Sequence, residues 1–134
     1  MISEGLAPHE ADPTSWYSAA GLPYGYSIDE AGFETDPEEL QLVERAAGVT
    51  MRCDIGLHIF VSDVTGRPAL GRMAQRVARQ TDGWVFVEFH TPPTADLLDH
   101  LSNAGRGIRV SDAVYLDAAA TLAWNAHPDF HVVK

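Results

Sequence analysis

The spacing of apolar residues changes from a helical to a strand period in the middle third of the chain. Asp36 and Pro37 suit the cap and first position of a helix, Gly48 suits its end, and the apolar residues between them recur at helical spacing: Leu40, Val43 and Ala47. From 49 to 62 apolar and polar residues alternate, which predicts a half-buried strand. Gly56 lies in its middle, so this strand is predicted to bend or break there.

The same two periods recur through the rest of the chain. Pro68 opens a second predicted helix that Asp82 and Gly83 end. The run from Trp84 to His90 is almost continuously apolar and aromatic, which predicts a central strand. The remaining predicted elements are a helix from Thr94 to Gly105, a short strand at 108–110, a helix that begins at Asp112 or Asp117 and runs to about Ala126, and a final strand at 130–133.

This alternation predicts an α/β fold, with α+β as the alternative, in which about four helices cover a sheet of about four strands. It leaves a parallel and a mixed sheet both open. Residues 36–134 are predicted to form this single domain. Residues 1–35 show no sustained period but carry aromatic residues, which disordered segments usually lack, so we expect an irregular arm packed on the domain. These aromatic residues are Trp16, Tyr17, Tyr24, Tyr26 and Phe33.

Composition agrees with one packed domain and excludes several classes of protein. Of the 134 residues, 46% are apolar and 21% are charged, as in a folded globule. No run approaches the roughly 18 apolar residues that cross a membrane, and residues 1–16 do not resemble a signal peptide, so we expect a cytoplasmic protein. Cys53 is the single cysteine, which excludes an intrachain disulfide and predicts a buried, unreactive thiol.

The negative charge is concentrated in the first third of the chain. Residues 1–44 hold ten acids and no Lys or Arg, whereas residues 45–134 hold nine acids and nine bases, so the formal net charge of −10 comes from the first segment. An acidic surface repels the phosphates of nucleic acids and lipids and attracts a basic protein. We therefore expect neither nucleic acid nor membrane as a partner. The alternative is that the acidity only keeps the protein dissolved.

Motifs for catalysis or nucleotide binding are missing. The segment 66–73 has the glycine spacing of a phosphate-binding loop, but Arg72 and Met73 stand where that loop needs Lys and Ser or Thr. The chain has no Gly-x-Ser-x-Gly turn, and Cys53 has no cysteine-protease signature around it. We therefore expect no cofactor and a protein that is not an enzyme.

The C-terminal histidines carry the alternative of a metal-dependent hydrolase. His127, Asp129 and His131 would share one side of an extended strand, which is a workable donor set for zinc or iron. Such a site would need one more ligand, with His58, His90 or His100 as candidates. Structural or surface histidines are the simpler interpretation of the same residues.

The C-terminal stretch carries a resemblance to a known family. Its elements are Asp112 to Leu116, Ala123-Trp124 and the ending His-Pro-Asp-Phe-His-Val-Val-Lys at 127–134. Over about 23 residues this resembles the signature of an uncharacterised family of small bacterial proteins, frequent in actinobacteria. The resemblance implies an accessory role, and by analogy with comparable small acidic proteins it implies an immunity protein. It implies no catalytic residues.

Charge and resemblance together predict a binding protein that neutralises a basic toxin domain. Aromatic anchors ringed by carboxylates suit a tight interface, because the rings bury area and the carboxylates match Arg and Lys. We expect the partner on the aromatic and acidic segment that precedes and opens the first helix. Its predicted contact residues are Tyr24, Tyr26, Asp29, Glu30, Phe33, Glu34, Asp36, Glu38 and Glu39. A structural or regulatory subunit with a merely solubilising acidic face is the third alternative.

Overall fold

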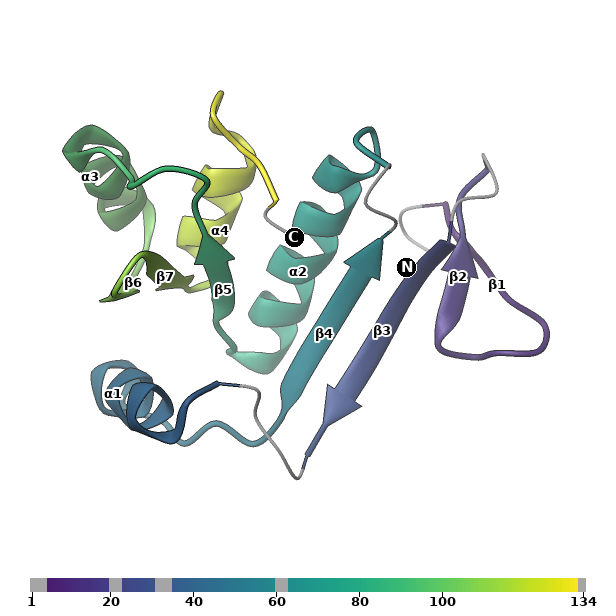
Figure 1. Ribbon diagram of the computed structural model, residues 1–134, viewed down its shortest axis with the longest axis horizontal. Coiled ribbons are helices and arrows are strands. Elements are labelled where there is room, and N and C mark those ends of the chain that lie inside the picture. Colours follow the sequence, from purple (N-terminus) through teal and green to yellow (C-terminus); the bar gives the residue numbers. More distant parts are fainter. Residues whose placement is uncertain (1–4, 20–22, 31–34, 60–62, 133–134) are drawn as a thin grey trace.

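A computed structural model describes residues 5–19, 23–30, 35–59 and 63–132 of the chain. These residues form two antiparallel sheets and four helices, an α+β arrangement (Figure 1). The predicted number of helices is confirmed within the described residues, and α+β is the one of the two predicted classes that holds.

The first sheet has four strands in the order β1-β2-β3-β4, and all its pairs are antiparallel. Its strands are β1 (Ala7–Pro8), β2 (Ser15–Tyr17), β3 (Pro23–Asp29) and β4 (Asp54–Ile59). Three of these strands lie within residues 1–35, so the prediction that this arm is irregular is wrong, although it does pack on the domain as Tyr24 contacts Leu70 and Met73. The reason is that the arm pairs with a distant strand: Tyr24 of β3 lies in register with Ile59 of β4.

The second sheet has three strands in the order β5-β7-β6, again all antiparallel. They are β5 (Val85–Glu88), β6 (Gly107–Val110) and β7 (Ala113–Leu116). β5 is therefore an edge strand and not the predicted central one, and β7 was not predicted. Residues 130–132 form no strand, because they pack as an irregular tail against the end of β5 and against α2.

Local capping explains where the four helices begin and end. They are α1 (Pro37–Ala47), α2 (Arg67–Thr81), α3 (Ala95–Ala104) and α4 (Ala118–Asn125). Asp36 caps α1 as predicted, Gly48 ends it at a φ of 77°, and Asp117 rather than Asp112 caps α4. No helix in the described segments has the length and apolar character needed to cross a membrane.

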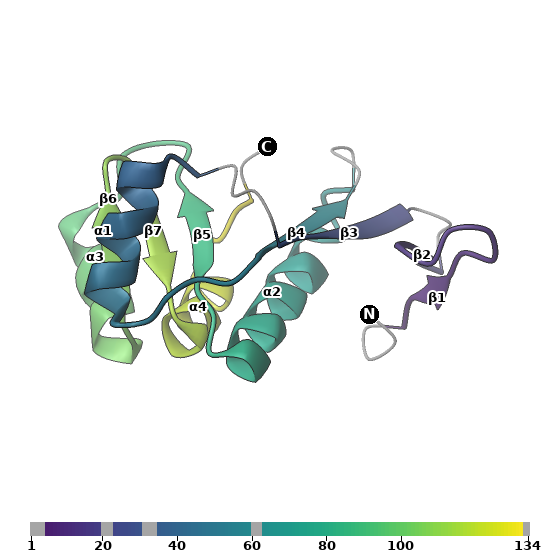
Figure 2. The ribbon, with the colours of Figure 1, turned by 90° about the horizontal axis from the view of Figure 1, so that it is seen from below.

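The helices cover the two sheets unevenly. α3 and α4 pack on one face of the three-stranded sheet around Val87, Leu101 and Trp124, while α1 packs on its opposite face around Val43 and Ile108. α2 lies between the two sheets, where Leu70 and Met73 contact the four-stranded sheet (Figures 1 and 2). The face that carries α1 is the one on which the site described below lies.

Candidate functional site: an acidic and aromatic surface

The two tyrosines of the predicted interface lie on the inner face of the four-stranded sheet. Tyr24 is only 4% exposed, packs with Leu70 and Met73, and donates its hydroxyl hydrogen bond to Oδ2 of Asp63 at 3.1 Å. The prediction that Tyr24 contacts a partner is therefore wrong, because its ring belongs to the core. Tyr26, two residues further on, shares this inner face and is half-buried.

Asp29, the last residue of β3, lies on the other side of the sheet. Side chains alternate along a strand, so Asp29 is on the face opposite Tyr24 and Tyr26. Asp29 is exposed and lies in register with Asp54 at the start of β4, and the exposed Glu30 follows it. The predicted contact residues Phe33 and Glu34 lie outside the described residues.

The remaining predicted acids open helix α1. Asp36 is engaged as the cap, since Oδ1 accepts from the N–H groups of Glu38 at 2.8 Å and Glu39 at 3.4 Å. Glu38 is exposed in the first turn, where a negative charge is favoured by the helix dipole. Glu39 is half-buried and turns toward the three-stranded sheet, where its Oε1 accepts a hydrogen bond from the hydroxyl of Tyr115 at 2.8 Å.

Tyr115 of β7 joins the acids of the two sheets. Its pKa is raised to about 12, first by burial and then by the hydrogen bond to Glu39 and the negative charges of Glu39 and Asp54, while a hydrogen bond from Thr35 acts in the opposite direction. The carboxylates of Glu39 on α1 and Asp54 at the start of β4 thus both act on the Tyr115 hydroxyl.

Beside Tyr115, a hollow of about 360 Å³ opens between α1, β5 and the turn that joins β6 to β7. Phe86 is 50% exposed in it, and its ring centroid lies 5.2 Å from that of Tyr115. The lining residues, all in the described part of the chain, include three carboxylates and no basic side chain. We call this the acidic hollow, and it is lined by Glu39, Phe86, Glu88, Phe89, Val110, Ser111, Asp112 and Ala113.

Five carboxylates thus follow one another from the end of the four-stranded sheet to the far rim of the acidic hollow. We call this row the acidic surface: Asp29, Asp54, Glu39, Glu88 and Asp112. Only Asp29 and Glu39 belong to the residues predicted from the sequence. Phe86 and Glu88 were missed because their strand was predicted to be central. Glu88 was the available signal, since a charged residue within an apolar run indicates one solvated face.

The raised pKa of Tyr115 leads to a prediction for alkaline pH. In the folded chain the phenol should ionise near pH 12 instead of 10.0, so the stability that it contributes is complete below pH 10 and is lost between pH 10 and 12. Titration of phenolate absorbance should show a late step that Tyr115→Phe removes. Glu39→Gln should shift this step to lower pH, because one of the charges that oppose ionisation is gone. A late step that survives Tyr115→Phe would contradict the assignment.

The C-terminal histidines are packed with aromatic rings. The His131 ring stacks on His90 at 4.4 Å and contacts Trp124 edge-on at 5.1 Å. The N–H of His90 donates to Nε2 of His131 at 3.2 Å, and Nδ1 of His131 donates to the carbonyl of Asp129 at 2.7 Å. Among the described residues, no three side chains of His, Cys, Asp or Glu come together as a metal site, and this includes His127, Asp129 and His131.

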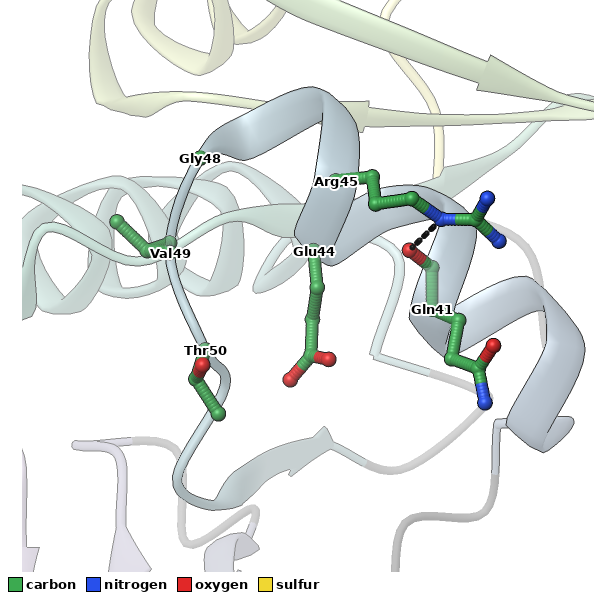
Figure 3. Close-up of a pocket in the computed structure, with 6 residues that line it drawn as sticks. All are labelled: Gln41, Glu44, Arg45, Gly48, Val49 and Thr50. Atoms are coloured by element: carbon green, nitrogen blue, oxygen red, sulfur yellow. Dashed lines mark hydrogen bonds between the residues drawn. The ribbon is translucent and has the colours of Figure 1, made fainter.

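A second, more open hollow of about 480 Å³ lies at the other end of α1 (Figure 3). Its side chains support the backbone: Oε1 of Glu44 accepts from the N–H of Met51 at 2.8 Å, and Nε of Arg45 donates to the carbonyl of Gln41 at 3.3 Å. Figure 3 shows the Glu44 side chain beside the loop segment that contains Thr50. The contact of Glu44 with Met51 holds the loop between α1 and β4 in place, whereas that of Arg45 lies within α1.

Comparison with known proteins adds no relative, since no family model, no curated protein and no solved structure matches this chain. The resemblance of the C-terminal stretch to a family of small bacterial proteins stays a prediction.

Proposed function

We propose that this chain is a non-enzymatic binding protein that holds a basic protein on its acidic surface, and that the partner is a toxin domain which it neutralises. The observation that carries the proposal is the acidic hollow, where a half-exposed aromatic ring is surrounded by three carboxylates. Large exposed aromatic side chains are typical anchors of protein interfaces. Unbalanced carboxylates around such a ring select a partner rich in Arg and Lys.

The charge of the whole chain supports the same class of partner. The formal net charge of −10 and the row of five carboxylates attract a basic protein over a distance and speed its encounter. The same field repels nucleic acids and anionic membranes. We also propose a cytoplasmic location, in agreement with the free Cys53.

The experiment is capture of the partner from an extract of the cells that carry the gene, followed by association kinetics. We expect one stoichiometric basic protein. Asp29→Lys combined with Glu88→Lys, two exposed members of the acidic surface, should slow its association about tenfold or more at low salt, and added salt should reduce the difference. The captured protein should stop growth when it is expressed alone, and co-expression of this chain should restore growth.

A control with the same net charge separates the acidic surface from acidity in general. Glu10→Lys combined with Asp99→Lys also changes two exposed acids, in the region before β2 and on α3, and should leave association nearly unchanged. If both double variants slow association equally, the acidic surface is not the interface. If no basic partner is captured, or if the captured protein is harmless, the toxin-neutralising role is wrong.

A further inference from the structure

The face of the three-stranded sheet that carries α1 is covered only in part. α1 packs against β6, where Val43 and Ala47 contact Ile108. Phe86 and Glu88 of β5 point to this same face, and both are exposed. Figure 2 shows α1 closer to β6 than to β5, and among the described residues Phe86 on this edge strand is 50% exposed.

The chemistry of this uncovered face favours a planar cation. The Phe86 ring lies in a tilted pair with Tyr115, and the face of such a ring attracts a cation electrostatically. Glu88 and Asp112 stand on the rim as hydrogen-bond acceptors. A guanidinium fits this combination better than an ammonium, because it is flat, weakly hydrated and able to donate to two carboxylates while it stacks.

On the basis of the proposed function, we propose that the acidic hollow receives an arginine side chain of the basic partner. Its guanidinium stacks on Phe86 and pairs with Glu88 and Asp112. Glu39 lines the hollow, and the hydrogen bond of 2.8 Å that it accepts from the Tyr115 hydroxyl holds its side chain in place. The hollow thus determines which side chain of the partner is bound, while the other carboxylates of the acidic surface attract the partner and speed its association.

The test uses two small probes of equal charge, acetyl-triarginine amide and acetyl-trilysine amide, titrated into the full chain and followed by backbone amide NMR. We expect saturable shifts around 86–88 and 110–113, with the arginine peptide bound more tightly. Phe86→Leu keeps apolar bulk but removes the aromatic face, and should weaken the arginine peptide about two- to fivefold while barely changing the lysine peptide. Glu88→Gln with Asp112→Asn should weaken both probes, less so at high salt.

Leu122→Ala is the matched control, since Leu122 is 58% exposed on α4 and should affect neither probe. Equal affinity for the two probes, shifts elsewhere, or an arginine affinity that Phe86→Leu leaves unchanged would overturn the arginine site. This outcome is separate from the proposed function, which fails when no basic partner is captured. A captured partner whose binding ignores Phe86→Leu would retain the function and remove the arginine site.

Discussion

Replacing Trp124 with alanine is expected to lower the free energy of unfolding by about 3–5 kcal/mol. Trp124 is 2% exposed and packs in the cluster that joins Leu97 of α3 to Leu116 of β7. Its ring also lies edge-on to Phe89 at 5.3 Å and to Phe130 at 5.6 Å, so the substitution leaves a cavity at the meeting point of a helix pair, a sheet and the tail. Urea unfolding should show a lower midpoint with an unchanged slope.

Leu122 provides the control within the same helix, because it is 58% exposed and Leu122→Ala should change stability by less than about 0.5 kcal/mol. Trp124→Phe keeps an aromatic ring and should lower the free energy of unfolding by less than Trp124→Ala does. A domain of this size has a total stability of about 5–15 kcal/mol, so the alanine variant should be visibly unfolded at moderate temperature. A loss below about 1 kcal/mol would show that the α3 and α4 cluster does not hold this half of the molecule together.

The helices were predictable because their signals are local. Asp36, Pro37 and Gly48 lie within one short segment, and the structure uses them as cap, first position and left-handed end of α1. The fourth helix had two candidate caps, Asp112 and Asp117. The structure uses Asp117, because residues before it are taken up by β7.

The sheets were less predictable because their pairings are not local. β3 lies in a segment rich in Gly, Pro and Ser, which gave no sign of a strand. It forms a strand by pairing with β4, where Tyr24 lies opposite Ile59, thirty-five residues later in the chain. β5 has the apolar run of a central strand, yet in the order β5-β7-β6 it forms an edge. Its place in the sheet does not follow from its own residues, and Glu88 is the one local sign that the face carrying Phe86 is solvated.

The acidic character of the candidate site was predictable, whereas its aromatic anchor was not. Asp29 and Glu39 could be chosen as contact residues from their charge alone. Tyr24 was also chosen, because β3 was not predicted as a strand and the sequence therefore did not show that its ring points into the core. The acids of the first segment gain their aromatic neighbours from the last third of the chain, through the hydrogen bond from Tyr115 to Glu39. Contacts of this kind depend on the tertiary fold.

Replacing Asp63 with alanine should be the second most destabilising change, at about 2–4 kcal/mol. Asp63 is a carboxylate only 4% exposed, placed just before α2. Its Oδ1 accepts from the N–H of Gly66 at 2.8 Å and the hydroxyl of Thr65 at 3.1 Å, and Oδ2 accepts from the hydroxyl of Tyr24 at 3.1 Å. The substitution removes the acceptor of three donors at once, two of them buried, and thermal or urea unfolding measures the loss.

A double-mutant cycle tests whether Asp63 and Tyr24 act as a pair across the sheet and the start of α2. Tyr24→Phe alone should lower the free energy of unfolding by about 1 kcal/mol, since the Asp63 carboxylate still accepts hydrogen bonds from Gly66 and Thr65. The double variant Asp63→Ala with Tyr24→Phe should lower the free energy of unfolding by less than the sum of the two single effects. Asp63→Ala removes the acceptor of the Tyr24 hydroxyl, and in the double variant that hydroxyl is no longer there. Asp63→Asn keeps an amide oxygen for the Gly66 N–H and should fall between wild type and Asp63→Ala. Strict additivity would mean that the hydrogen bond between Tyr24 and Asp63 does not couple the two side chains.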